Sequence, residues 1–171
     1  TPDENSIAVA ELVLGLMLSL VRKIPLAWKD TRAGGWKRQK FTGGELYGKT
    51  LGIVGFGRIG RLVAERAAAF GMTLLAYDEF VASDSPEAER LNTTMITFEE
   101  LLRRAHFVTL HVPLTDSTSG FFGLDKFRQM KQNACFINSS RGEVVNEADL
   151  ITALETGEIA AAALDVRSLE P

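Results

Sequence analysis

Residues 50–60 read TLGIVGFGRIG, and this stretch decides the fold. An apolar run leads directly into Gly55, Gly57 and Gly60, which follow the GxGxxG pattern, and a helix rich in alanine is expected next. In such a strand–turn–helix unit, Gly55 permits a tight turn, Gly57 lets a pyrophosphate approach the backbone and Gly60 lets the helix pack close to the strand. The free N–H groups of the turn and the positive end of the helix dipole then face the phosphates. The stretch therefore predicts a dinucleotide site. The alternative is a tight turn without a ligand, which the flanking strand and helix disfavour.

Strands and helices alternate along the rest of the chain. Strands are expected at residues 50–54, 73–77, 107–111, 135–138 and 161–164, and helices at residues 59–70, 98–104, 124–129 and 147–156. Short apolar strands separated by helices are typical of a parallel sheet that is covered on both faces. Because crossovers between parallel strands are right-handed, the pattern predicts a Rossmann-type, doubly wound α/β sheet.

A long apolar helix is expected before this sheet, capped by Asn5 or Ser6 and ending near Arg22. It is apolar on nearly all sides, and a helix of that kind needs partners all round. We therefore expect a second domain or subunit to pack on it. Residues 30–48 are rich in glycine, basic and aromatic residues, which predicts an irregular arm with its aromatic side chains against the core.

The composition fits one globular domain in a reducing compartment. A net charge of -3 over 171 residues gives no large basic surface for nucleic acid. The single cysteine, Cys135, rules out an internal disulfide and favours a cytoplasmic location. The apolar residues 7–21 include Glu11 and fall short of the ~20 residues that a membrane span needs. Neither a membrane partner nor a metal site is expected.

The second predicted strand ends at Asp78. This carboxylate lies near the ~20-residue spacing at which an acidic residue meets the adenosine ribose hydroxyls. It would accept hydrogen bonds from both hydroxyls and would repel a 2′-phosphate, so Asp78, followed by Glu79, favours NAD over NADP. The alternative is a carboxylate in a surface turn.

Three further motifs begin where predicted strands end, at the edge where open α/β sheets bind ligands. They are His111-Val112-Pro113, the Asn-Ser-Ser-Arg-Gly run at residues 138–142, and residues 163–171 with the sequence ALDVRSLEP. On these motifs, the sequence resembles the NAD-binding domain of the D-2-hydroxyacid dehydrogenases, nearest to the phosphoglycerate dehydrogenase branch. The resemblance covers essentially the whole chain, from Thr1-Pro2 to Glu170-Pro171.

The resemblance implies two catalytic residues. Arg141 would bind the carboxylate and carbonyl of the substrate, a task that suits the fixed, always charged fork of a guanidinium. Glu170 would pair with a histidine, the general acid–base, raising its pKa. That histidine is expected beyond Pro171. His106 is expected to be structural.

The resemblance also implies the positions that line the cofactor, many of them through the backbone. They are Gly55, Gly57, Arg58, Ile59, Gly60, Asp78, His111, Val112, Pro113, Ser139, Ser140, Arg141 and Asp165. Asn5 matches a position near the substrate in some relatives. Arg167 departs from the family, because relatives usually carry an aromatic residue there, and this leaves the substrate's identity open.

The family has two domains, so residues 1–171 are expected to be the NAD-binding domain of a larger enzyme whose substrate domain is absent from this chain. Residues 1–47 would form the interdomain and dimerisation helix and arm, and residues 48–171 the Rossmann core. The implied activity is an NAD-dependent oxidoreductase that acts on a small D-2-hydroxy acid as a homodimer, with this fragment binding NADH but inactive alone. A non-catalytic NAD-sensing corepressor is the alternative. An S-adenosylhomocysteine hydrolase-like domain is a third, which the motifs at 138–142 and 165–171 disfavour.

Overall fold

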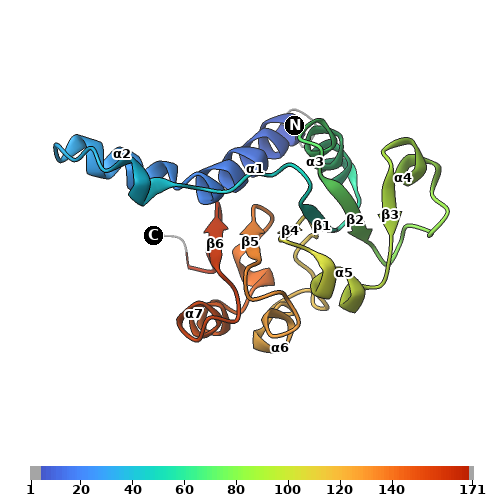
Figure 1. Ribbon diagram of the computed structural model, residues 1–171. Coiled ribbons are helices and arrows are strands. Elements are labelled where there is room, and N and C mark those ends of the chain that lie inside the picture. The colour runs from blue at the N-terminus through green and yellow to red at the C-terminus, as the bar shows by residue number, and fades with distance from the viewer. Residues whose placement is uncertain (1–4, 170–171) are drawn as a thin grey trace.

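A six-stranded parallel sheet with helices on both faces forms the body of the protein, in a computed structural model that describes residues 5–169 (Figure 1). The elements in chain order are α1 Asn5–Val21, α2 Ile24–Arg32, the 3-10 helix η1 Arg38–Phe41, β1 Thr50–Val54, α3 Arg58–Ala69, β2 Thr73–Tyr77, α4 Pro86–Arg90, β3 Thr93–Met95, α5 Phe98–Arg104, β4 Phe107–Leu110, α6 Leu124–Phe127, β5 Cys135–Asn138, the 3-10 helix η2 Gly142–Val144, α7 Glu147–Glu155 and β6 Ala161–Leu164.

The strand order is β3-β2-β1-β4-β5-β6. The first strand, β1, therefore lies in the middle of the sheet. The next two strands extend the sheet outward to β3, and β4 to β6 extend it on the other side of β1. This order confirms the parallel α/β sheet of Rossmann type. The strands and helices expected between residues 50 and 164 are present, with small differences at their ends.

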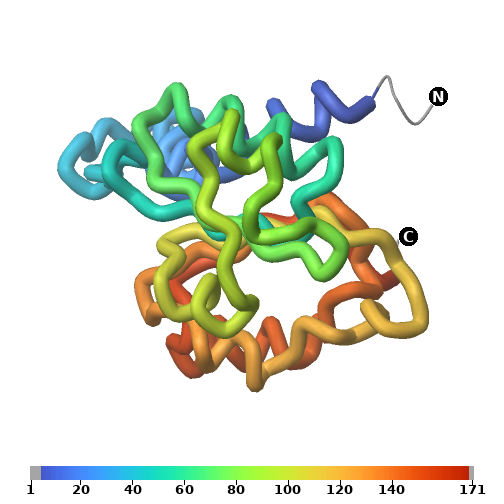
Figure 2. Tube along the Cα trace, turned by 90° about the vertical axis from the view of Figure 1, so that its right-hand side faces the viewer, coloured from blue at the N-terminus to red at the C-terminus, as the bar shows by residue number. Residues whose placement is uncertain are grey.

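Each face of the sheet has its own apolar core. On one face lie α1 and α3, and on the other lie α5, α6 and α7 (Figure 1), so that the sheet runs between two helical layers in the turned view (Figure 2). Met17 and Val63 are fully buried in the first core. In the second core the rings of Phe122, Phe127 and Phe136 pack with centroids 4.8–5.1 Å apart.

The connections hold elements that the sequence did not predict. The strand β3 and the short helix α4 were missed because both are brief and carry little hydrophobic periodicity. The arm was predicted to begin at residue 30 and to be irregular, but α2 extends to Arg32 and η1 follows. Pro25 lies in the first turn of α2, a position that suits its fixed φ. The aromatic side chains of the arm do not all pack on the core, since Trp36 is 77% exposed.

The helix α1 buries one side against this chain. Its buried residues are Ser6, Ala10, Val13, Leu14 and Met17. The apolar side chains of Ile7 and Leu12 are exposed, and α2, which projects away from the sheet (Figure 1), exposes Leu26 and Trp28. Part of the apolar surface of both helices therefore has no cover within residues 5–169. None of the helices in that range has the length and apolar character to cross a membrane.

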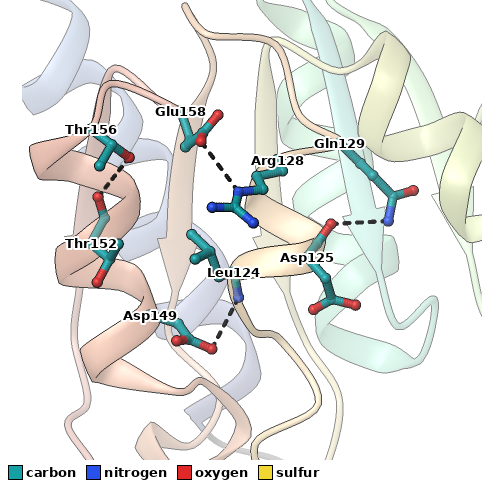
Figure 3. Close-up of polar contacts among 8 residues, drawn as sticks. All are labelled: Leu124, Asp125, Arg128, Gln129, Asp149, Thr152, Thr156 and Glu158. Carbon is teal, nitrogen blue, oxygen red and sulfur yellow. Dashed lines mark hydrogen bonds and ion pairs between the residues drawn. The ribbon is translucent and has the colours of Figure 1, made fainter.

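Hydrogen bonds join α6 to α7 on the second face (Figure 3). The Leu124 N–H at the start of α6 donates to Asp149 Oδ2 over 3.0 Å, so a side chain of α7 caps the neighbouring helix. Arg128 Nε donates to Glu158 Oε1 over 3.4 Å at the other end of the contact. The Leu124–Asp149 bond is the stronger link, because Arg128, just after α6, and Glu158, just after α7, form a more exposed pair.

Asp149→Ala is expected to lower the free energy of unfolding by about 1 kcal/mol, because it removes the cap of α6. Thr152→Ala is the matched control: the Thr152 hydroxyl bonds only within α7, to the Ala148 carbonyl, so its loss should change stability by less than about 0.5 kcal/mol. Urea unfolding followed by circular dichroism measures both. Equal stabilities for the two variants would contradict the capping role.

Candidate functional site

The register of the sheet places the ends of five strands in one row. Across the sheet the aligned residues are Tyr77, Val54, Leu110, Asn138 and Leu164. The next residue of each strand's connection is then Asp78, Gly55, His111, Ser139 and Asp165. All five were predicted site residues, and the fold brings them to one edge. The row spans the boundary between β1 and β4, where the strand order reverses and open α/β sheets bind ligands.

The three glycines of the turn have different surroundings. Gly55 has a φ of +93°, and a Cβ there would lie 2.6 Å from the His111 carbonyl oxygen. A Cβ on Gly60 would overlap the Gly55 carbonyl oxygen, so the first turn of α3 packs directly on the glycine turn. A Cβ on Gly57 would meet nothing within 4 Å. The fold therefore needs glycine at positions 55 and 60. Gly57 instead leaves its backbone open to the outside of the protein.

The Asp78 carboxylate is tied to the glycine turn. Its Oδ2 accepts the Phe56 N–H over 2.7 Å, and its Oδ1 accepts the Phe80 N–H over 2.8 Å. Phe56 was not predicted as a site residue, and its backbone contact could not be read from side-chain chemistry. Because a carboxylate has about four acceptor sites, Asp78 keeps capacity for two ribose hydroxyls while it braces the turn.

His111 closes the other side of the turn. Its N–H donates to the Val54 carbonyl over 2.7 Å, and its Nε2 lies 3.1 Å from the hydroxyl of buried Thr109. Burial lowers the pKa of His111 to about 4, so the imidazole is neutral at neutral pH. Val112 follows against Gly55, and the Pro113 carbonyl accepts the Thr118 hydroxyl over 2.6 Å.

Asn138 organises the loop that carries Arg141. Its side-chain N–H donates to the Arg141 carbonyl over 2.9 Å, and its Oδ1 accepts both the N–H and the hydroxyl of Ser140 over 3.0 and 2.8 Å. The Asn138 side chain is buried, and it was missed as a site residue. The signal was an amide at a strand end, three residues before an arginine.

The Arg141 side chain is exposed at this edge and donates to the Ser140 carbonyl over 2.7 Å. It lines an open hollow, whose other residues are Gly142, Glu143, Val166, Arg167 and Ser168. Ser139, next to this loop, is buried, and its hydroxyl has no hydrogen-bond partner among residues 5–169.

Asp165 and Asn5 differ in their relation to this edge. The Asp165 N–H donates to the Asn138 carbonyl over 3.0 Å, and its side chain is exposed. Asn5 is exposed in the first turn of α1, and no contact within the described chain joins its side chain to Arg141. Glu170 lies outside the described residues. Across residues 5–169 no group of three His, Cys, Asp or Glu side chains could hold a metal ion.

His106 is structural, as expected. Its Nδ1 accepts the Thr50 N–H over 3.1 Å at the start of β1, far along the strand from the row of strand ends. Burial, and then the neighbouring Lys131 and Lys49 charges, lower its pKa.

Comparisons with known proteins fit this arrangement. The sequence model of the family described as D-isomer specific 2-hydroxyacid dehydrogenase, NAD binding domain, matches residues 14–171. The D-3-phosphoglycerate dehydrogenase of Methanocaldococcus jannaschii is 47% identical over 171 residues, which cover 99% of this chain and 32% of that protein.

Solved structures share the fold over nearly the whole chain. The pyruvate reductase of Chlamydomonas reinhardtii has a TM-score of 0.93 at 33% identity, over 99% of this chain and 49% of that one. A D-lactate dehydrogenase with NAD+ from Lactobacillus jensenii has a TM-score of 0.86 at 37% identity, over 98% and 50%. The chain thus spans about a third of the curated relatives and about half of these solved chains.

Lowering the pH is expected to reduce the free energy of unfolding of the isolated chain. This loss begins at pH values above the range in which carboxylates titrate. The folded pKa of His111, about 4, lies below its ordinary value of 6.5, so the unfolded state binds the proton first and stability is lost as pH falls through 6.5. From about pH 7.5 to about pH 5.5 the loss through His111 is about 1 kcal/mol. His106, whose pKa is also lowered, adds to the loss with the same sign.

Urea unfolding at both pH values measures this loss, with His111→Gln as the comparison. The variant should lose less stability than the wild type over the same interval. An equal loss in both proteins would contradict the assignment to His111.

Proposed function

The chain belongs to the D-isomer specific 2-hydroxyacid dehydrogenases, as their NAD-binding domain, and we propose that it carries NAD and the substrate-binding arginine of an enzyme that transfers hydride between NAD and a D-2-hydroxy acid. The observation that carries the proposal is the position of Arg141. Its loop, fixed by Asn138, follows a strand that ends in the same row as the glycine turn. A substrate held by Arg141 would therefore lie at the edge of the sheet that binds the cofactor.

NAD, when bound, accepts or donates the hydride. The residues of this chain that would hold it are divided along the row of strand ends. The backbone of Gly57, Arg58 and Ile59 offers N–H groups and the positive end of α3 to the pyrophosphate. Asp78 would accept the ribose hydroxyls and disfavour a 2′-phosphate.

The residues that follow β4, β5 and β6 would contact the nicotinamide end of NAD. These proposed contacts are His111, Val112, Pro113, Ser139, Ser140, Arg141 and Asp165. The Ser139 hydroxyl, which is buried and has no hydrogen-bond partner among residues 5–169, supports a ligand here, because buried polar groups normally have such a partner.

Arg141 has the chemistry for a 2-oxo acid. Its guanidinium can hold the carboxylate through paired donors and can polarise the carbonyl that receives the hydride. We include Asn5 as a weaker substrate contact. The small 2-hydroxy or 2-oxo acid is the proposed partner of this site.

We infer that neither of the two histidines of this chain is the proton-transfer group. The His106 ring accepts the Thr50 N–H, and the His111 ring is neutral and set against Thr109. We infer that the group comes from a segment outside residues 1–171, oriented by Glu170. We also infer that a substrate domain completes the enzyme, which the coverage of about a third of the curated relatives supports.

Turnover by the full-length protein tests this function. It is expected to oxidise NADH with a 2-oxo acid such as glyoxylate, hydroxypyruvate or phosphohydroxypyruvate. Arg141→Lys should lower kcat/KM by about 100-fold or more, because an ammonium cannot replace the paired donors. Arg128→Gln, which removes an exposed arginine paired with Glu158, should leave kcat/KM unchanged. NADH binding without turnover of any 2-oxo acid would contradict the proposed enzyme activity and would favour the NAD-sensing corepressor.

Gly57→Ala is expected to keep the fold and to weaken NADH binding at least about tenfold, because the added methyl has room in the protein but crowds the pyrophosphate. Gly15→Ala is the control, since its Cβ also meets nothing in this chain. Fluorescence titration with NADH and thermal unfolding measure the two effects. Unchanged NADH affinity in Gly57→Ala would remove Gly57 from the proposed site.

We propose that two copies of the chain associate through the first helix and the arm. Exposed apolar side chains support it on α1, where Ile7 is 53% and Leu12 39% exposed, and on α2 and the arm, where Leu26 and Trp28 are 60% and Trp36 77% exposed. Large exposed apolar patches mark association sites, and two-fold dimers are the commonest closed assembly.

Light scattering on a sizing column tests the dimer. The double variant Leu26→Glu with Trp28→Glu is expected to run as a monomer, because dimerisation would then have to bury two unpaired carboxylates in the proposed interface. Ile151→Glu changes an equally exposed side chain on α7 and should stay dimeric. A wild-type monomer, or dissociation in both variants, would contradict the proposal.

A further inference from the structure

Two loops of the candidate site touch through their backbones. One carries Arg141 and Gly142, and the other is the segment 166–168 that follows β6. A Cβ on Gly142 would overlap the carbonyl of Arg167 and the backbone nitrogen of Ser168. The two loops therefore approach more closely than any residue with a side chain at position 142 would allow, and together they line the hollow at Arg141.

The Glu147 carboxylate bridges to the second of these loops from the first turn of α7. Its Oε1 accepts the Ser168 N–H over 2.6 Å, and its Oε2 lies 3.5 Å from Arg167 Nη2. The Glu147 side chain is 22% exposed, whereas that of Arg167 is 66% exposed. The bond from the Ser168 N–H is therefore the stronger contact, since an exposed ion pair contributes little. It is also the main reason that the pKa of Glu147 lies below its ordinary value, so the carboxylate is charged at neutral pH.

We propose that Glu147 is a positioning residue: it holds the segment 166–168 against the Arg141 loop and so sets the shape of the hollow around Arg141. The proposal rests on the proposed function, because it takes Arg141 as the substrate-binding group. Glu147 does not touch the substrate. It acts through the Ser168 backbone and the close contact at Gly142.

The geometry of α7 separates this role from general support of the fold. Asn146, whose side chain accepts the Asp149 N–H, caps α7, so the helix does not need the Glu147 side chain for its own start. Asp149, on the same helix, makes the same kind of bond, a carboxylate to a backbone N–H, but to Leu124 of α6. One helix thus carries two comparable carboxylate contacts, and only one reaches the site.

The test compares Glu147→Ala, Glu147→Gln and Asp149→Ala in the full-length protein, at a temperature where all are folded. Glu147→Ala is expected to lower kcat by about tenfold to 100-fold, because small misplacements of binding groups are costly in rate. NADH affinity should change much less than kcat, by at most about threefold, since Arg141 and Asp165 lie near the released segment but the glycine turn and Asp78 lie elsewhere in the row. Glu147→Gln keeps an acceptor for the Ser168 N–H and should recover kcat to within about threefold of wild type. Asp149→Ala should lose stability but not kcat.

A second readout does not depend on turnover. Hydrogen exchange of the Ser168 amide, followed by mass spectrometry of its peptide, should become faster in Glu147→Ala and stay unchanged in Asp149→Ala. Equal losses of kcat in Glu147→Ala and Asp149→Ala would overturn the proposal, as would unchanged Ser168 exchange in Glu147→Ala. If the wild type turns over no 2-oxo acid, the proposed function fails, and the exchange measurement still decides whether Glu147 holds the segment.

Discussion

The parallel register of β2, β1, β4, β5 and β6 is the constraint on which the rest of the site depends. Because the aligned residues at the ends of these strands fall in one row, five separate connections open at the same edge. The row exists only if β1 and β4 stay adjacent, and the close contact of Gly55 with the His111 carbonyl closes their boundary. A slip of any one strand by one residue would turn that strand's side chains to the wrong face and move its connection out of the row.

Hydrogen bonds between side chains and the backbone then shape three of these connections. The glycine turn is braced by Asp78, the Arg141 loop by Asn138, and the segment after β6 by Glu147. In each case a side chain donates to or accepts from a backbone group of the loop. The backbone of the Arg141 loop is thus held by buried Asn138, while the guanidinium is exposed and donates to the Ser140 carbonyl.

Much of this could be predicted from the sequence, for a physical reason. Buried parallel strands are short apolar runs, and glycines in a GxGxxG turn have steric tasks that leave a readable pattern. The row of Asp78, Gly55 and Asp165 followed from knowing where the strands end. By contrast, β3 has three residues and no periodicity, and α4 is fixed by a Ser85 cap and Pro86 rather than by an apolar face.

Asn138 bonds locally, to Ser140 and Arg141, and its signal, an amide at a strand end, was overlooked. Phe56 and Glu147 were missed because their contribution is a tertiary hydrogen bond between a carboxylate and a backbone N–H. No local pattern marks the partner of such a bond. The exposure of Trp36 was missed for a related reason, since an aromatic residue is read as core unless something shows that the chain cannot cover it.

The double contact of Asp78 has a consequence for any attempt to redesign cofactor preference. The same carboxylate that would disfavour a 2′-phosphate also satisfies the Phe56 and Phe80 N–H groups. Replacing it with a small or basic residue would leave those donors without their acceptor, so selectivity and the rigidity of the turn cannot be altered separately. A successful exchange would have to supply a new acceptor from another residue, and the change of preference would then require coordinated substitutions in place of a single one.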